Sequence, residues 1–142
     1  MGWSKRAETL LREAGWFPGR EVDITRWEDL VTDEGFPLHA EARRFLREFG
    51  GLVVEVDDDS EGVDRAPASF DLDPDLCSGQ REWFERLGRR AGATLFPVGD
   101  VEGGHAHLGV DERGGVHMLF LDEVHFLGKR GEALGNLIDG VR

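Results

Sequence analysis

Apolar residues recur at helical spacing in several parts of the chain. In residues 3–14 they fall three or four positions apart, and Gly15 follows with the residue type that ends many helices. Residues 38–49 and 79–91 have the same spacing, and a last segment begins near Arg130. Each of these patterns predicts an amphipathic helix with one face on a common core.

A further helix is expected after the turn at Pro18 and Gly19. Thr25 is followed three residues later by Glu28, which is the spacing of a capping box, so the sequence predicts that the helix begins at Thr25. Its buried side would consist of Trp27, Leu30 and Val31.

The remaining apolar segments are short and rich in β-branched or aromatic residues, which favours strands. We expect strands at 52–56, around Phe70, at 94–98, at 106–111, at 116–121, and through Val124 and Phe126. Helices that are separated along the chain from a largely antiparallel sheet, part of it a meander, indicate an α+β fold. No linker divides the chain, so we expect a single domain over residues 1–142.

The composition narrows the classes of partner. Seventeen basic and 29 acidic side chains give a formal net charge of −12 over 142 residues. This argues against nucleic acid, whose phosphates need clustered Lys and Arg, and it favours a protein partner with a basic surface. No apolar run approaches the roughly 20 residues that span a membrane, and no secretory signal precedes the first helix, so we expect no membrane association and a cytoplasmic location.

Three of the five histidines lie in the predicted meander, where they raise the question of a metal site. If the turn pairs Asp111 with Val116, strand alternation places His107 and His117 on opposite faces. His105 and His107 would then share a face and form half of a zinc site without an evident third ligand. A connection of odd length would shift this register, so a small metal-binding protein remains the least favoured alternative.

Other candidate chemistry is weaker still. The run that starts at Asp57 resembles the first half of a calcium loop, but its twelfth position is Ala68, which has no ligand atom. The lone Cys77 excludes an internal disulfide and has no nearby histidine in the sequence to activate it. We therefore expect no cofactor, no metal and no catalytic residue.

The order of several segments resembles a known family. These segments are "AGWFPGREVD", Trp27 and Leu30, Ala42, "FLREFGGLVVEV", "SFDLDP", "LFPVGDVEGGHAHLGVDERGGVHML" and the closing "GEALGNLIDGVR". Together they are similar to the third group of the SUKH superfamily of bacterial immunity proteins, over nearly the whole chain. The resemblance implies an α+β fold and a role in binding and blocking a bacterial toxin, often a nuclease or a deaminase, without catalysis.

Within the similar segments most residues have structural interpretations. Glycines at 19, 50, 51 and 99 allow corners, and five apolar residues are expected in the core: Trp16, Phe45, Leu46, Phe49 and Phe96. Arg20, a charged residue just after a turn, is expected to pair with a carboxylate at the edge of the core and not to touch a partner.

The expected contact surface follows from charge alone. Acidic side chains can occupy a cleft that evolved for a phosphate-rich substrate. The expected partner-binding residues are Asp57, Asp58, Asp59, Glu61, Asp71, Asp73 and Asp75, clustered at one edge of the sheet. The alternative within the same fold is a regulatory or scaffold protein that binds a different cellular partner.

Overall fold

The computed structural model describes residues 2–56 and 68–140. Their strands form one six-stranded antiparallel sheet in which each strand pairs with its neighbours in sequence. The strands are β1 (Val53–Val54), β2 (Phe70–Asp71), β3 (Phe96–Val101), β4 (Ala106–Val110), β5 (Gly115–Phe120) and β6 (Glu123–Lys129). With the helices below, this sheet confirms the predicted α+β class.

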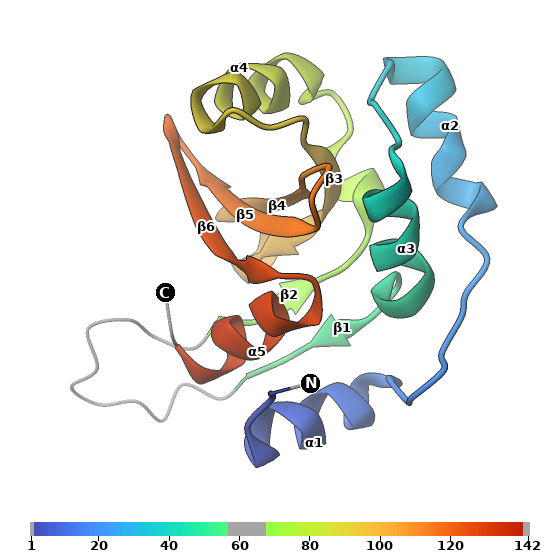
Figure 1. Ribbon diagram of the computed structural model, residues 1–142, viewed down its shortest axis with the longest axis vertical. Helices are drawn as coiled ribbons and strands as arrows, with labels where there is room; N and C mark the ends of the chain where they lie inside the picture. The colour runs from blue at the N-terminus through green and yellow to red at the C-terminus, as the bar shows by residue number, and fades with distance from the viewer. Residues whose placement is uncertain (1, 57–67, 141–142) are drawn as a thin grey trace.

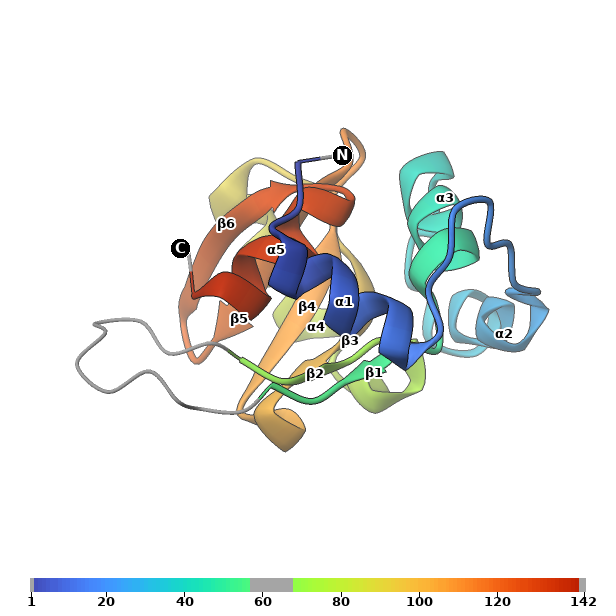
Figure 2. The same cartoon turned by 90° about the horizontal axis from the view of Figure 1, so that it is seen from below.

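In the described part of the chain, five α-helices surround the sheet (Figure 1). They are α1 (Lys5–Ala14), α2 (Thr25–Glu34), α3 (Ala40–Phe49), α4 (Arg81–Ala91) and α5 (Gly131–Asp139), with short 3-10 turns η1 (Pro74–Cys77) and η2 (Glu102–Gly104). Helix α5 packs against β6 and α1, α3 contacts β3 and β4, and α4 contacts β6. Seen from below, α1 lies across the sheet end that holds β1 and β2 (Figure 2).

The core predicted from the sequence is confirmed where the structure describes it. Trp16, Phe45, Leu46, Phe49 and Phe96 are all buried. The two ends of the chain meet in this core, because the ring of Trp3 packs edge-on against Trp16 at 4.7 Å and its indole nitrogen donates to the Gly131 carbonyl. Burial of aromatic rings of this size supplies much of the favourable free energy of folding.

Helix boundaries were predicted with mixed success. Gly15 adopts the left-handed conformation that closes α1, as expected. The predicted capping box is wrong, because Asp23 accepts hydrogen bonds from the Thr25 backbone and hydroxyl, while Glu28 forms an ion pair with Arg43. Trp27 is buried, and the side chains of Leu30 and Val31 lie outside the described residues.

Helix α3 begins at an unexpected cap. The His39 ring accepts a hydrogen bond from the Ala42 amide through Nδ1, and its Nε2 lies within 3.1 Å of the carbonyl oxygens of Thr94 and Val110. One imidazole therefore satisfies an amide at the start of α3 and joins the helix to the sheet.

Arg20 makes internal contacts, but the predicted acceptor was wrong. Its guanidinium donates to the main-chain carbonyls of Glu48 and Gly50, at 2.6 and 2.8 Å, instead of to a carboxylate. These two carbonyls lie at the end of α3, where no helical amide remains to bond them. Arg20 thus closes α3 and has a structural role.

The register of the β4–β5 hairpin differs from the prediction by one residue. Val110, and not Asp111, pairs with Val116, so the connection has an odd number of residues. Asp111 is responsible, because its carboxylate accepts from the amides of Arg113 and Gly115. A side chain at Gly115 would collide with that carboxylate, so glycine is required at this position.

Candidate functional site

The predicted contact residues divide into two groups. Asp57, Asp58, Asp59 and Glu61 lie outside the described residues, as does most of the calcium-like run. Asp71 ends β2, Asp73 precedes η1 and Asp75 lies in its first turn, so the three described acids lie close together along the chain.

Asp73 has a structural role within this group. Its carboxylate accepts from the Asp75 amide at 3.0 Å and from the indole nitrogen of Trp27 at 3.2 Å, so it caps η1 and joins it to α2. Asp75 is exposed, and its ion-pair partner Arg26 is 4.0 Å away. Burial and then the charge of Asp73 raise the pKa of Asp75.

The strand register aligns one residue from each strand across the whole sheet. Successive Cα partners give the cross-sheet row Val53, Asp71, Asp100, His107, Leu119 and Val124. Residues paired in this way point to the same face, and directly opposed Cβ atoms are about 5 Å apart. The row therefore places two carboxylates and an imidazole side by side between apolar ends.

The adjacent row of paired residues points to the opposite face of the sheet, and its composition is entirely apolar. Val54, Phe70, Val101 and Ala106 are also successive partners, and all four are buried hydrophobic residues. In the cross-sheet row, Val53 is exposed, and Asp71 and His107 are half-buried. Polar residues thus occupy the middle of a face that helices cover only in part.

Asp100 lies at the centre of the cross-sheet row and was not among the predicted residues. It is buried, with 7% of its surface exposed, yet its carboxylate has no hydrogen-bond donor among residues 2–56 and 68–140. Burial, followed by the charges of Asp71 and Asp73, raises its pKa. Burial and then the charge of Asp73 also raise the pKa of Asp71. The two neighbouring carboxylates therefore repel each other in a partly desolvated setting.

An aromatic wall borders the carboxylates on the side of β4. The imidazole of His107 packs edge-on against the ring of Trp83 from α4, with centroids 5.4 Å apart. Burial lowers the pKa of His107, so the ring is mostly neutral at neutral pH. The Trp83 indole nitrogen donates to the Leu121 carbonyl at 2.7 Å, which fixes α4 to the β5–β6 turn.

The histidines do not gather into a metal site. The observed odd-length connection places His107 and His117 on the same face, but each ring has separate neighbours, and His105 packs against Phe120 at 4.8 Å. Within the part of the chain that the structure describes, no group of three or more His, Cys, Asp or Glu side chains is arranged to hold a metal ion.

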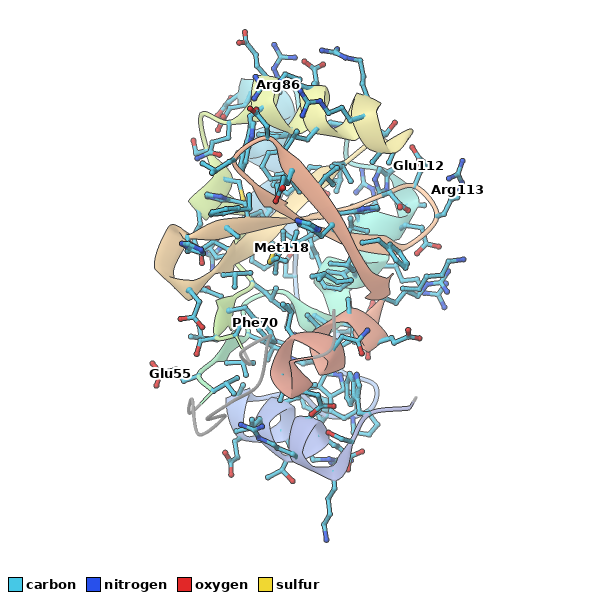
Figure 3. The ribbon with its side chains drawn as sticks, turned by 90° about the vertical axis from the view of Figure 1, so that its left-hand side faces the viewer. Glu55, Phe70, Arg86, Glu112, Arg113 and Met118 are labelled. Carbon is cyan, nitrogen blue, oxygen red and sulfur yellow. The ribbon has the colours of Figure 1, made fainter. Side chains whose placement is uncertain are left out.

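His117 instead forms a hydrogen bond with a second buried carboxylate, that of Asp111. Its Nε2 donates to Asp111 at 2.7 Å, and its ring packs against Phe126. Burial alone would raise the pKa of Asp111, but the bonds from His117 and from the amides of Gly115 and Arg113 outweigh it, so that the pKa is lowered. This pair stabilises the β4–β5 turn, whose residues Glu112 and Arg113 lie on the other side of the view from Glu55, which follows β1 (Figure 3).

Cys77 is not an activated thiol, and a cleft beside α4 is lined largely by apolar and ion-paired side chains. Cys77 is buried, its thiol donates to the Gly99 carbonyl at 3.3 Å, and burial raises its pKa far above the ordinary value, so the reactive thiolate is disfavoured. A cleft of about 330 Å³ beside α4 has the buried rings of Phe36 and Phe84 among its lining residues. Arg81 and Glu85 on the same cleft form an ion pair at 3.3 Å.

Further findings come from the helices and from comparisons with known proteins. No helix that the structure describes is both long and apolar enough to cross a membrane. The model of one protein family, described as SUKH-3 immunity protein, matches residues 3–140. Searches of curated proteins and of solved structures each found no match.

Proposed function

Because the chain belongs to the SUKH-3 immunity protein family, we propose that it binds one cognate bacterial toxin and neutralises it by covering a basic active-site cleft. The observation that carries this proposal is the family match, which extends over nearly the whole chain. The toxin class that best suits the charge is a nuclease or a deaminase, since such enzymes bind phosphate-rich substrates through basic residues.

The charge distribution supports a docking role. A net charge of −12 favours association with a basic protein through long-range attraction, which raises the association rate. Asp71 and Asp75 have raised pKa values because neighbouring acids repel them and burial disfavours their charge. An approaching cationic surface would relieve this repulsion, so binding is favoured at this edge.

In this proposal the protein inhibits by occupying space and contributes no chemical step. The contact surface is the sequence-predicted acidic set, with Asp71 and Asp75 as its described members and Asp57, Asp58, Asp59 and Glu61 as members still expected from the sequence. Asp73 supports that surface from below through its bonds to η1 and Trp27.

The test is direct binding to the toxin encoded beside the gene for this chain. Calorimetry of the two purified proteins should show a stoichiometric complex, and the complex should lack the toxin's activity. Failure of the wild-type chain to bind or inhibit that toxin would refute the proposed function.

Charge reversal then tests the surface. We expect Asp75→Lys, and separately the joint reversal of Asp57, Asp58, Asp59 and Glu61 to Lys, to weaken binding about tenfold or more and to lower its salt dependence. Glu13→Lys is the matched control, because Glu13 is an exposed acid on α1. Glu13→Lys should bind like the wild type, and if the two variants of the acidic set did so as well, that set would not be the contact surface.

A further inference from the structure

Asp100 on β3 is a buried carboxylate that lacks a partner among the residues that the structure describes. The carboxylate of Asp100 has no bonded donor among the described residues, although only 7% of the residue is exposed. Burying an ionised carboxylate without a hydrogen bond is costly, and most buried polar groups in native proteins are therefore paired. An unpaired group of this kind calls for a donor, and residues 2–56 and 68–140 do not supply one.

A second carboxylate lies beside it. Asp71 is the cross-strand partner of Asp100, and both side chains point to the same face of the sheet. Directly opposed like charges destabilise a strand pair. None of the ion pairs between described residues involves either aspartate. The pair is therefore a concentrated negative charge that no cation among residues 2–56 and 68–140 compensates.

The surroundings favour one shape of cation. On β4, the strand that pairs with β3 on the side away from Asp71, the cross-strand partner of Asp100 is His107. The His107 ring packs against the ring of Trp83. A guanidinium group is planar, forms paired hydrogen bonds with carboxylates, and packs well on aromatic rings. A lysine ammonium is a more strongly hydrated point charge, and the described carboxylates and histidines do not bring three metal ligands together.

We propose that the Asp71–Asp100 pair is the receptor for an arginine side chain of the toxin, whose guanidinium lies over the two carboxylates and extends toward the ring of His107. This inference rests on the proposed function and deepens it by naming a contact. Asp100 is the buried anchor, and Asp71 is the half-buried entrance. In the complex the arginine satisfies Asp100 and removes the repulsion between the two acids.

Asp100→Asn is the decisive variant. The amide is nearly the same size as the carboxylate and removes an unpaired charge, so the fold should be retained, which a thermal melt of the variant checks. We expect its affinity for the toxin to fall about tenfold or more relative to the wild type, mainly through faster dissociation. The matched control, Glu13→Gln, removes one negative charge from the exposed face of α1 and should bind within about twofold of the wild type.

Different results would refute the proposed function and the arginine receptor. If the wild type did not bind the toxin, the proposed function would be wrong. If the wild type bound it and Asp100→Asn bound equally well, the toxin would be neutralised elsewhere and the arginine receptor would be refuted.

A small probe separates arginine from other cations. L-argininamide, titrated into the wild-type chain, should shift the NMR signals of His107 and of the Asp100 amide, whereas L-lysinamide should shift them less. Asp100→Asn should abolish the response to L-argininamide. Equal responses to the two probes, or a response that persists in Asp100→Asn, would overturn the assignment to a guanidinium.

Discussion

Asp111 directly follows β4 and Asp100 lies in β3, and the two are buried to nearly the same extent, with 6% and 7% of their surfaces exposed. Each has a histidine as its neighbour, His117 and His107 respectively. Asp111 accepts three hydrogen bonds, two from backbone amides and one from the imidazole. Asp100 accepts none from the described residues and lies opposite another carboxylate.

The difference separates a structural carboxylate from one available to a partner. The bonds to Asp111 lower its pKa, which means that its charged form stabilises the fold. Burial and neighbouring charges raise the pKa of Asp100, so its charged form destabilises the fold. The chain's own donors account for the buried Asp111 in the hairpin. Asp100, which no described residue bonds, fits the proposed contact with a partner.

The largest expected effect on stability comes from removing the Asp111 carboxylate in the β4–β5 turn. We expect Asp111→Ala to lower the free energy of unfolding at neutral pH by about 3 kcal/mol, because three bonds to a buried charged acceptor are lost and the donors remain unpaired. Urea denaturation followed by circular dichroism measures the change. Glu82→Ala, at an exposed position in the first turn of α4, is the control and should stay within about 0.5 kcal/mol of the wild type. A loss below that value for Asp111→Ala would show that the turn does not depend on this carboxylate.

The same measurement on Asp100 should give the opposite sign. Asp100→Asn removes a buried charge and its repulsion by Asp71, so we expect stability at neutral pH to be unchanged or raised by about 1 kcal/mol. The gain is smaller than the loss at Asp111, because the amide is itself a buried polar group. A destabilisation of more than about 1 kcal/mol would mean that Asp100 has a stabilising partner within the chain, which would contradict the role proposed for it.

The hydrophobic pattern predicted the elements better than their pairing. Periodicity identified the helices and the meander, because each element must bury one face on the shared core. It did not give the β4–β5 register, since that depends on the bonds between the Asp111 carboxylate and the Gly115 and Arg113 amides. Side-chain bonds to a turn leave no mark in an alternation of polar and apolar residues.

The candidate site depended on pairing and was therefore only partly predictable. The acidic composition drew attention to Asp71, Asp73 and Asp75, and two of them lie at the proposed surface. Asp100 was missed because the strand was expected to end at residue 98, whereas β3 continues to Val101. A side chain at Gly99 would collide with the Asp71 carbonyl, so the glycine lets β2 and β3 approach closely beside Asp100. The pairing of Asp100 with Asp71 can be recognised only when the register of β2 and β3 is known.

The smallest expected effect is the pH dependence, which distinguishes the two aspartates by sign. The pKa of Asp100 is raised in the folded state, so its contribution favours folding below the ordinary aspartate value near 3.9 and is lost as pH rises through the folded-state pKa. The pKa of Asp111 is lowered, so its contribution is present above about 3.9 and is lost as pH falls through the folded-state pKa.

We expect the stability of Asp111→Asn to approach that of the wild type on acidification, and the advantage of Asp100→Asn to disappear over the range from neutral pH to about pH 4. Urea denaturation of the three proteins at several pH values measures both differences. If the two differences changed with pH in the same way, the two carboxylates would have equivalent surroundings, and Asp100 would be no better suited to a partner's arginine than Asp111 is.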